Sequence, residues 1–372
     1  MRQISPSYLE QSLGGDTGRK ARVAGLDILR AMAIVCVIGG HYFINTDFNS
    51  TPFDSPLLFL LGMLQTFSLI GVPLFLMLTG YLNINKTDVN HKYYKGIWRV
   101  LIAYLVFSVL TIAVREVYFD EHKSLVKWTL EITSFNAINY AWYIEMWIGL
   151  FLLTPFLNRL WHSLESKRLR QVLIATMFLC ASLPDFTNRY GVELLPEYWR
   201  AAAYPLLTFY LGCYLRSYQP KVKTIRLVTA ITALCLFNPV ATLVLAHGRP
   251  MMHLQGSPMG IVVIPLAVCV FLLFYRRAIS NRPLKSLVTR ISLVSLEMYL
   301  AAYIFDRLAY PLWYEAAGGT QAELAPLYVP IVLSLVTATF VTGCVYNFVH
   351  NKVKAIWVWG RGVALTREPE RA

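Results

Sequence analysis

The sequence has few charged residues. Only 15% of its 372 residues are Asp, Glu, Lys or Arg, whereas a soluble domain carries about a quarter. Hydrophobic residues make up 56% of the chain, and the mean hydropathy is positive at +0.49. This composition excludes an ordinary soluble globular domain and indicates an integral membrane protein.

The sequence also lacks the marks of several other classes. Its six cysteines form no CxxC pair and all fall in apolar segments, so neither a disulfide framework nor a metal site is indicated. The segments between the apolar runs are too short to hold a soluble domain. No internal repeat is evident, which argues against the two-halves symmetry of many transporters. The first apolar run is not followed by a clear cleavage site, so it does not read as a signal peptide.

Long apolar runs are what the chain does have, and each is long enough to cross about 30 Å of hydrocarbon. Since helices satisfy their own backbone hydrogen bonds in lipid, we expect an all-α polytopic transmembrane helical bundle with about ten spans. The polar residues 1–24 and 356–372 would be cytoplasmic tails, and residues 25–355 one membrane domain. The spans are expected near residues 26–44, 57–82, 98–118, 139–160, 171–184, 201–215, 227–246, 259–275, 291–310 and 327–349.

Positive charge is distributed unevenly between the two sides of these spans. If the N-terminus lies inside, only seven of the 34 Lys and Arg residues fall on the outer side. The positive-inside rule therefore predicts that both termini are cytoplasmic. The net charge of +13 is explained by this topology and gives no support to nucleic-acid binding, because the basic residues are spread over many short loops. The seven are Arg115, Lys123, Lys127, Arg189, Arg200, Arg249 and Arg307.

The first span carries an arginine and a histidine. In GLDILRAMAIVCVIGGHYF, residues 25–43, Arg30 and His41 are eleven positions apart. That spacing is about 1100° of helix rotation, close to three full turns, with a rise of about 16 Å. Both side chains therefore face the same way, Arg30 near the cytoplasmic side and His41 in the outer third. Asp27 precedes Arg30 by one turn and is placed to orient it. The alternative is that both side chains only reach toward the headgroups.

Ionisable residues within a span are functional candidates by default, because lipid makes them costly. Glu145, on the fourth span, is expected at the depth of His41, where a carboxylate can orient an imidazole. A structural hydrogen bond is an equal alternative for Glu145. Glu297 is expected near the depth of Arg30 as its structural ion-pair partner. Asp306, near the outer end of its span, is expected at the interface.

A basic segment precedes the third span. In HKYYKGIWRVL, residues 91–101, Lys92, Lys95 and Arg99 are spaced to share one face of a helix entering the membrane. Such a face suits phosphate groups. The positive-inside rule alone would also place these residues there.

The chain carries, in this order, the motifs GLDILRAMAIVCVIGGH, GVPLFLMLTGYL, AWYIEMWIGLFLLTPFLN and SLVSLEMYLAAYIF. Together they resemble acyltransferase family 3, and the closest branch resembles the bacterial surface-polysaccharide O-acyltransferases. GLDILRAMAIVCVIGGH resembles the opening helix of that family, with its LDxLR start and its Arg and His. GVPLFLMLTGYL at 71–82 resembles the FFxLSGYL signature, with Thr79 in place of the usual Ser. AWYIEMWIGLFLLTPFLN at 141–158 and SLVSLEMYLAAYIF at 292–305 resemble two later signatures.

The resemblance implies an integral enzyme of the bacterial plasma membrane. It would move an acyl group, commonly acetyl, from cytoplasmic acyl-CoA to a hydroxyl of a surface glycan or lipid-linked sugar. The essential pair of the family maps onto Arg30 and His41. Its basic segment, often R-x-x-R, maps loosely onto Lys92, Lys95 and Arg99, and this chain departs from that spacing. The late signature often ends YLxH, whereas Tyr299-Leu300 is followed here by two alanines.

On this basis Arg30 would bind the acyl-CoA end, and His41, oriented by Glu145, would act as general base on the acceptor hydroxyl. An acyl-histidine relay is the alternative mechanism. The alternative function is a transporter or flippase for a lipid-linked sugar, which the buried charges and the Gly71-Val72-Pro73 interruption would also suit. Consumption of acyl-CoA discriminates between the two. Neither a metal nor a nucleic-acid partner is expected.

Overall fold

The computed structural model describes residues 22–187, 192–195, 198–246 and 257–365. In these ranges the chain forms helices joined by short loops, without a strand. The helices are α2 (Ala24–Asn45), η1 (Phe48–Ser50), α3 (Pro56–Ser68), α4 (Gly71–Asn83), α5 (His91–Tyr94), η2 (Lys95–Ile97), α6 (Trp98–Phe119), α7 (Leu125–Thr133), α8 (Trp142–Ser163), α9 (Lys167–Thr187), α10 (Tyr198–Tyr218), α11 (Thr224–Ala246), α12 (Val263–Phe274), α13 (Arg282–Leu293), α14 (Ser295–Ala316), α15 (Gln321–Leu324), η5 (Ala325–Leu327) and α16 (Tyr328–Leu365).

The chain is an all-α polytopic membrane protein, as the sequence predicts. Every expected span falls on a helix or on a consecutive pair of helices. Six helical segments of the described chain are long and apolar enough to cross a membrane, and a seventh is obtained if the bent pair α13 and α14 is one span. These criteria support six or seven of the ten expected spans, and α8, α10 and α12 do not meet them.

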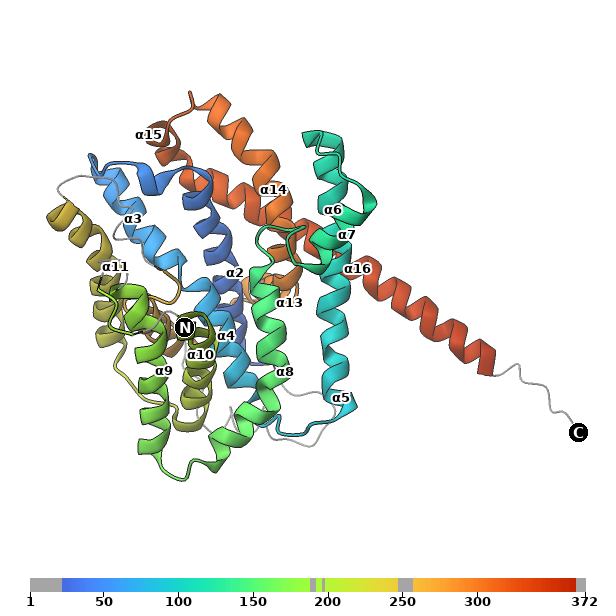
Figure 1. Cartoon of the computed structure of the whole chain (residues 1–372), viewed down its shortest axis with the longest axis horizontal. Helices are drawn as coiled ribbons and strands as arrows, with labels where there is room; N and C mark the ends of the chain where they lie inside the picture. Colours follow the sequence, from blue (N-terminus) through green and yellow to red (C-terminus); the bar gives the residue numbers. More distant parts are fainter. Residues whose placement is uncertain (1–21, 188–191, 196–197, 247–256, 366–372) are drawn as a thin grey trace, which may run out of the picture.

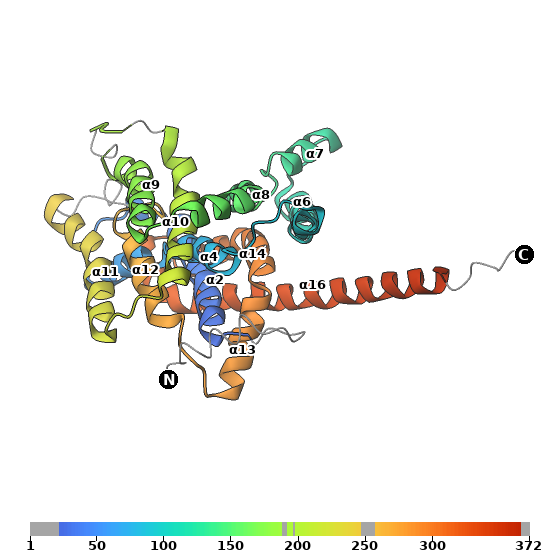
Figure 2. The same ribbon diagram turned by 90° about the horizontal axis from the view of Figure 1, so that it is seen from below.

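Helix α2 lies at the centre of the bundle and packs against α3, α4, α12, α13, α14 and α16 (Figure 1). Most of its length is buried by these neighbours, and 13 of its 22 residues are buried. The second half of α16 extends away from the bundle in both views (Figures 1 and 2). That helix continues unbroken to Leu365, past the domain end expected at residue 355. The central position of α2 means that the side chains of Asp27, Arg30 and His41 lie within the bundle.

Two glycines explain the GVPLFLMLTGYL motif on α4. A Cβ atom at Gly71 would lie 2.8 Å from the carbonyl oxygen of Ala33 on α2. A Cβ atom at Gly80 would lie 2.0 Å from the carbonyl oxygen of Phe209 on α10. Small residues allow helix backbones to approach closely in a membrane, where apolar burial drives association less than packing does. The motif therefore fixes α4 tightly between α2 and α10.

An ionic cluster joins α6, α7 and α14 at one end of the bundle. We call Arg115, Glu121, Lys123, Glu131 and Arg307 the α6–α7 ionic cluster. The Arg115 guanidinium, only 8% exposed, lies 2.8 Å from both the Glu121 and the Glu131 carboxylates. Arg307 of α14 lies 2.5 Å from the other Glu121 oxygen, and Lys123 pairs with Glu131. These bonds hold the loop after α6 and helix α7 against α14.

The cluster predicts a stability that depends on pH. Burial acts to raise the pKa of Glu121 and of Glu131, but the hydrogen bonds from their basic partners outweigh it and hold each pKa below its usual 4.5. A lowered carboxyl pKa contributes stability above the unfolded value and loses it as the pH falls through the folded value. We expect Arg115→Met to lower the unfolding free energy by about 1.5–3 kcal/mol at pH 7.

This prediction is checked by thermal unfolding in detergent at several pH values, with Arg168→Met on the exposed face of α9 as the control. The gap between wild type and Arg115→Met should narrow as the pH falls below about 4.5, where the acidic partners become protonated. A gap that stays constant with pH would show that Arg115 acts through packing alone.

Candidate active site

Arg30 and His41 project from the same stripe of α2, as their spacing predicts, and each lines a different cavity. We call these the Arg30 cavity and the His41 cavity. The Arg30 cavity has a volume of about 270 Å³ and the His41 cavity about 220 Å³. The eleven-residue separation corresponds to about 16 Å along the helix. One helix thus presents a cation to one space and an imidazole to another.

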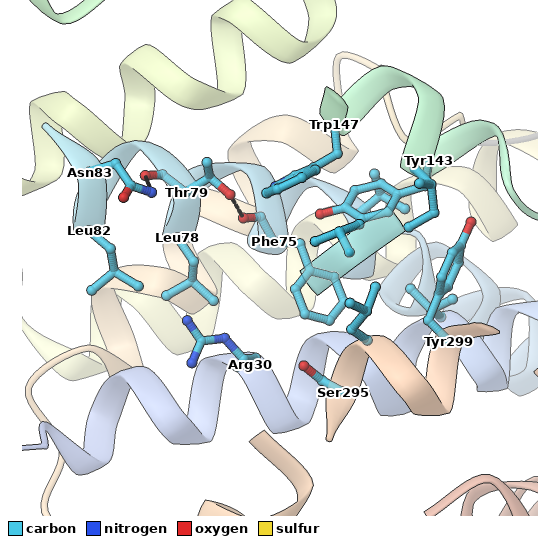
Figure 3. A pocket seen from close by; sticks show the side chains of 15 residues that line it. Arg30, Phe75, Leu78, Thr79, Leu82, Asn83, Tyr143, Trp147, Ser295 and Tyr299 are labelled. Carbon is cyan, nitrogen blue, oxygen red and sulfur yellow. Dashed lines mark hydrogen bonds between the residues drawn. The ribbon is translucent and has the colours of Figure 1, made fainter. Parts of the chain in front are cut away.

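The Arg30 cavity is lined by α2, α4, α8 and α14, and by Val100 of α6. Figure 3 shows the side chains of Tyr143 and Trp147 from α8, and of Ser295 and Tyr299 from α14, around the same space as the Arg30 guanidinium. The wall formed by α4 is mostly apolar. A polar edge is added by Thr79 and Asn83, whose side chains donate to backbone carbonyls of their own helix. Arg30 is therefore the only cationic residue among the lining residues of a largely apolar space.

Arg30 has no carboxylate partner in the described part of the chain. Its Nη1 donates to Ser292 Oγ at 3.3 Å, and Ser292 in turn donates to Asp27 at 2.8 Å. The Asp27 carboxylate forms an ion pair with Arg22, which contacts both of its oxygens at 2.6 and 2.8 Å. The sequence predicts a direct contact between Asp27 and Arg30, whereas in the structure Ser292 bridges the two side chains. The charge of Arg30 is thus left available to an anionic ligand.

The expected pair between Arg30 and Glu297 is not formed. Glu297 is buried, and its Oε1 lies 3.7 Å from Nη2 of Arg99 instead. The position of Glu297 along α14 fixes its depth in the membrane. It does not determine which face of α14 meets α2. Since α14 packs against both α2 and α6, Glu297 faces the α6 side.

The His41 cavity is mostly apolar, like the Arg30 cavity, and has a few polar groups in its wall. Asn49, Gln65 and Ser68 line it together with His41, Tyr140 and Trp142. Gln65 donates to Asn49 at 2.7 Å, which orders both amides at the cavity wall. Hydroxyl and amide groups of this kind suit a ligand that carries its own hydroxyl groups. The two cavities therefore differ in position and in their basic group, a guanidinium in one and an imidazole in the other.

His41 is paired with Asp306, not with Glu145. Nδ1 of His41 lies 2.9 Å from Oδ2 of Asp306, and both residues are buried. The two atoms are at contact distance without the in-line geometry of a full hydrogen bond. Alignments of this kind commonly tighten only when a ligand binds. Glu145 is exposed on α8 and makes no polar contact with the described residues, so its expected role as the partner of His41 is wrong.

Asp306 was expected at the interface because its span was expected to end near residue 310. Helix α14 continues to Ala316, which places Asp306 in the middle of the helix, 1% exposed. A longer reading of the apolar segment, through the Tyr310 to Trp313 aromatics, would have found it. Tyr140 was also missed. Its ring lies against that of His41, tilted by 32° with centroids 3.9 Å apart, and its hydroxyl accepts from Asn45.

The basic segment lies outside the Arg30 cavity. Lys92 is on α5, Lys95 on η2 and Arg99 on α6, and all three are exposed. The expected single helical face is therefore divided between α5, η2 and the first turn of α6. Lys92 and Lys95 form no ion pair with any described residue.

An aromatic stack connects this segment to the cavity. The Tyr93 ring stacks on Phe151 at 4.6 Å, and Phe151 stacks on Trp147 at 5.1 Å. Trp147 itself lines the Arg30 cavity.

The pairing of His41 with Asp306 determines what the imidazole can do. A carboxylate this close to Nδ1 favours the tautomer with the proton on that nitrogen once the geometry tightens, and Nε2 then carries the free lone pair. Nε2 makes no hydrogen bond with the described residues and can accept a proton from a ligand hydroxyl. This is the arrangement of a general base with its orienting acid.

Comparison with protein families identifies the chain. A family model described as an acyltransferase domain, Acyl_transf_3, matches residues 23–357. The chain belongs to acyltransferase family 3. This family-3 protein is therefore a multi-pass membrane acyltransferase, and the matched region contains both cavities. A search of curated proteins and a search of solved structures found no match.

Proposed function

We propose that this acyltransferase moves an acetyl group from acetyl-CoA on the Arg30 side to a hydroxyl of a surface glycan or lipid-linked sugar on the His41 side. The observation that carries the proposal is the pair of cavities on one helix stripe. One holds a cation without a carboxylate partner, and the other holds a histidine–aspartate pair. The basic residues indicate that the Arg30 side is cytoplasmic, where acyl-CoA is made.

The donor enters from the basic segment in this proposal. Lys92 and Lys95 are free to meet the phosphates of CoA. The Tyr93–Phe151–Trp147 stack offers flat apolar surfaces between that segment and the cavity. Arg30 lies deeper and meets the polar part of the acyl-CoA arm that enters the cavity. Arg99 is partly engaged by Glu297 and contributes less.

The chemistry takes place at His41. Nε2 accepts the proton of the acceptor hydroxyl as its oxygen attacks the thioester carbonyl carbon. The C–S bond then breaks, and the leaving thiolate takes the proton from the imidazolium to give free CoA. Asp306 stabilises the imidazolium between the two proton transfers. The ester forms on the acceptor, and no other reactant is needed.

The acceptor and the acyl group follow from the His41 cavity. Its volume of about 220 Å³ is small, which favours a short acyl chain such as acetyl. The lining amides and hydroxyl of Asn49, Gln65 and Ser68 suit a sugar, and Trp142 offers an aromatic face. We infer the plasma membrane of a bacterium as the location, because the acceptor is a cell-surface glycan.

The proposal is tested by acyl-CoA turnover in nanodiscs. Radiolabelled acetyl-CoA and crude cell-envelope glycans are added, and label in the glycan fraction is measured. We expect transfer that depends on both substrates. Binding and movement of a lipid-linked sugar without consumption of any acyl-CoA would instead support a flippase.

Replacing Arg30 should weaken donor binding more than it slows the chemical step. We expect Arg30→Ala to raise the KM for acetyl-CoA about 10- to 100-fold, the loss of one charge-assisted hydrogen-bonding group. Arg30→Lys should be intermediate, because lysine keeps the charge but not the planar fork. Arg168→Ala, an exposed arginine on α9, serves as the control and should leave KM unchanged. An unchanged KM in Arg30→Ala would remove Arg30 from the donor site.

A further inference from the structure

The two cavities share a wall. Val37 of α2, Val72 of α4 and Tyr299 of α14 line both of them. Among the described residues, no other lines both. The Arg30 cavity and the His41 cavity are therefore separated by a partition that is one side chain thick.

Two of the three wall residues cannot move far. Helices α2 and α4 are in direct backbone contact next to the valines, since a Cβ atom at Gly71 would lie 2.7 Å from Val37 and 2.8 Å from the Ala33 carbonyl oxygen. Valine is also restricted at χ1 within a helix. Tyr299 differs from the two valines, because its long side chain reaches the partition from a different helix, α14.

The side chain of Tyr299 is held in place by Tyr140, whose ring lies against that of His41. Its hydroxyl donates to the backbone carbonyl of Tyr140, and its ring packs edge-on against Tyr143 with centroids 5.5 Å apart. The Tyr140 ring in turn lies against that of His41. The position of Tyr299 is thus coupled, through Tyr140, to the imidazole that performs the chemistry.

We propose that Tyr299 is the gate between the donor and acceptor cavities. This proposal rests on the proposed function, because a thioester bound from the Arg30 side must pass the partition to reach His41. When Tyr299 leaves the Tyr140 carbonyl, the acyl group and the end of its arm enter the His41 cavity, and transfer is direct. When Tyr299 is closed, water and acceptor on the His41 side do not reach a thioester in the Arg30 cavity.

The gate is tested by thiol labelling, which requires no catalysis. In a background with all six native cysteines replaced and a monodisperse elution profile, Ser295→Cys marks the Arg30 cavity and Ser68→Cys marks the His41 cavity. Both changes preserve side-chain size. A small membrane-impermeant methanethiosulfonate is added to sealed vesicles from one side at a time, and the labelling rate is measured.

From the His41 side, we expect rapid labelling of Ser68→Cys and slow labelling of Ser295→Cys. Adding Tyr299→Ala should raise the Ser295→Cys rate from that side at least about tenfold, and Tyr299→Phe, which loses only the hydroxyl, should raise it less. Tyr303→Ala is the matched control. Tyr303 lies one turn further along α14 and also contacts Tyr140, but it lines neither cavity.

Three results would overturn the gate: equal labelling of the two positions with Tyr299 intact, no increase in either Tyr299 variant, or the same increase in Tyr303→Ala. Each can be obtained with acyl transfer fully intact. A failure of the gate is therefore distinguishable from a failure of the proposed function, which the turnover assay measures.

Discussion

Replacing His41 by alanine is expected to abolish acetyl transfer while acetyl-CoA still binds. A positioned general base contributes about 10²- to 10⁴-fold to the rate, and among the described residues no second histidine lines either cavity to replace it. The donor site at Arg30 is about 16 Å away along α2 and should be unaffected. Turnover with saturating donor and acceptor measures the loss, and calorimetry or equilibrium dialysis measures the retained binding.

The control for His41→Ala is His122→Ala. His122 is an exposed histidine in the loop after α6, where it pairs with Asp120. Its replacement should change neither turnover nor binding. Transfer that survives His41→Ala would keep the family assignment and remove the proposed mechanism.

Replacing Asp306 by asparagine is expected to lower kcat on the order of 10³-fold with little change in the KM for acetyl-CoA. The carboxamide keeps the size of the side chain but removes the charge that stabilises the imidazolium. Its NH₂ group can also donate to Nδ1, which would place the histidine proton on Nε2 and remove the base. Asp306→Glu retains the carboxylate and should recover part of the loss, which a purely structural role would not produce.

Glu145→Gln is the matched control for Asp306→Asn, since it removes a carboxylate that the sequence places at a similar depth. Glu145 is exposed and does not contact the imidazole, so kcat should be unchanged. A large loss in Glu145→Gln together with a small loss in Asp306→Asn would reverse the assignment of the orienting acid.

The sequence predicts the helices and the stripe on α2 well, because both depend on local periodicity. A single helix fixes the angle and the rise between Arg30 and His41, so no knowledge of the neighbouring helices is required. The GVPLFLMLTGYL motif is likewise a local pattern, although its reason emerges only when Gly71 and Gly80 are seen against α2 and α10.

Contacts between helices are what the sequence does not determine. Depth in the membrane suggests Glu145 for His41 and Glu297 for Arg30, yet rotation and tilt of α8 and α14 decide which side chains meet. In the structure, Asp306 lies beside His41, and Arg99 lies beside Glu297. The same limit applies to Tyr299, whose place in the partition depends on the meeting of α2, α4 and α14.

Transfer across sealed vesicles tests the central claim most directly. Vesicles of uniform orientation receive radiolabelled acetyl-CoA on the Arg30 side and a glycan acceptor on the His41 side only, and label is followed on the acceptor. The account predicts labelled glycan on the His41 side, free CoA on the Arg30 side, and neither with His41→Ala. Labelling only when donor and acceptor share one side, or no acyl-CoA consumption in either arrangement, would contradict it.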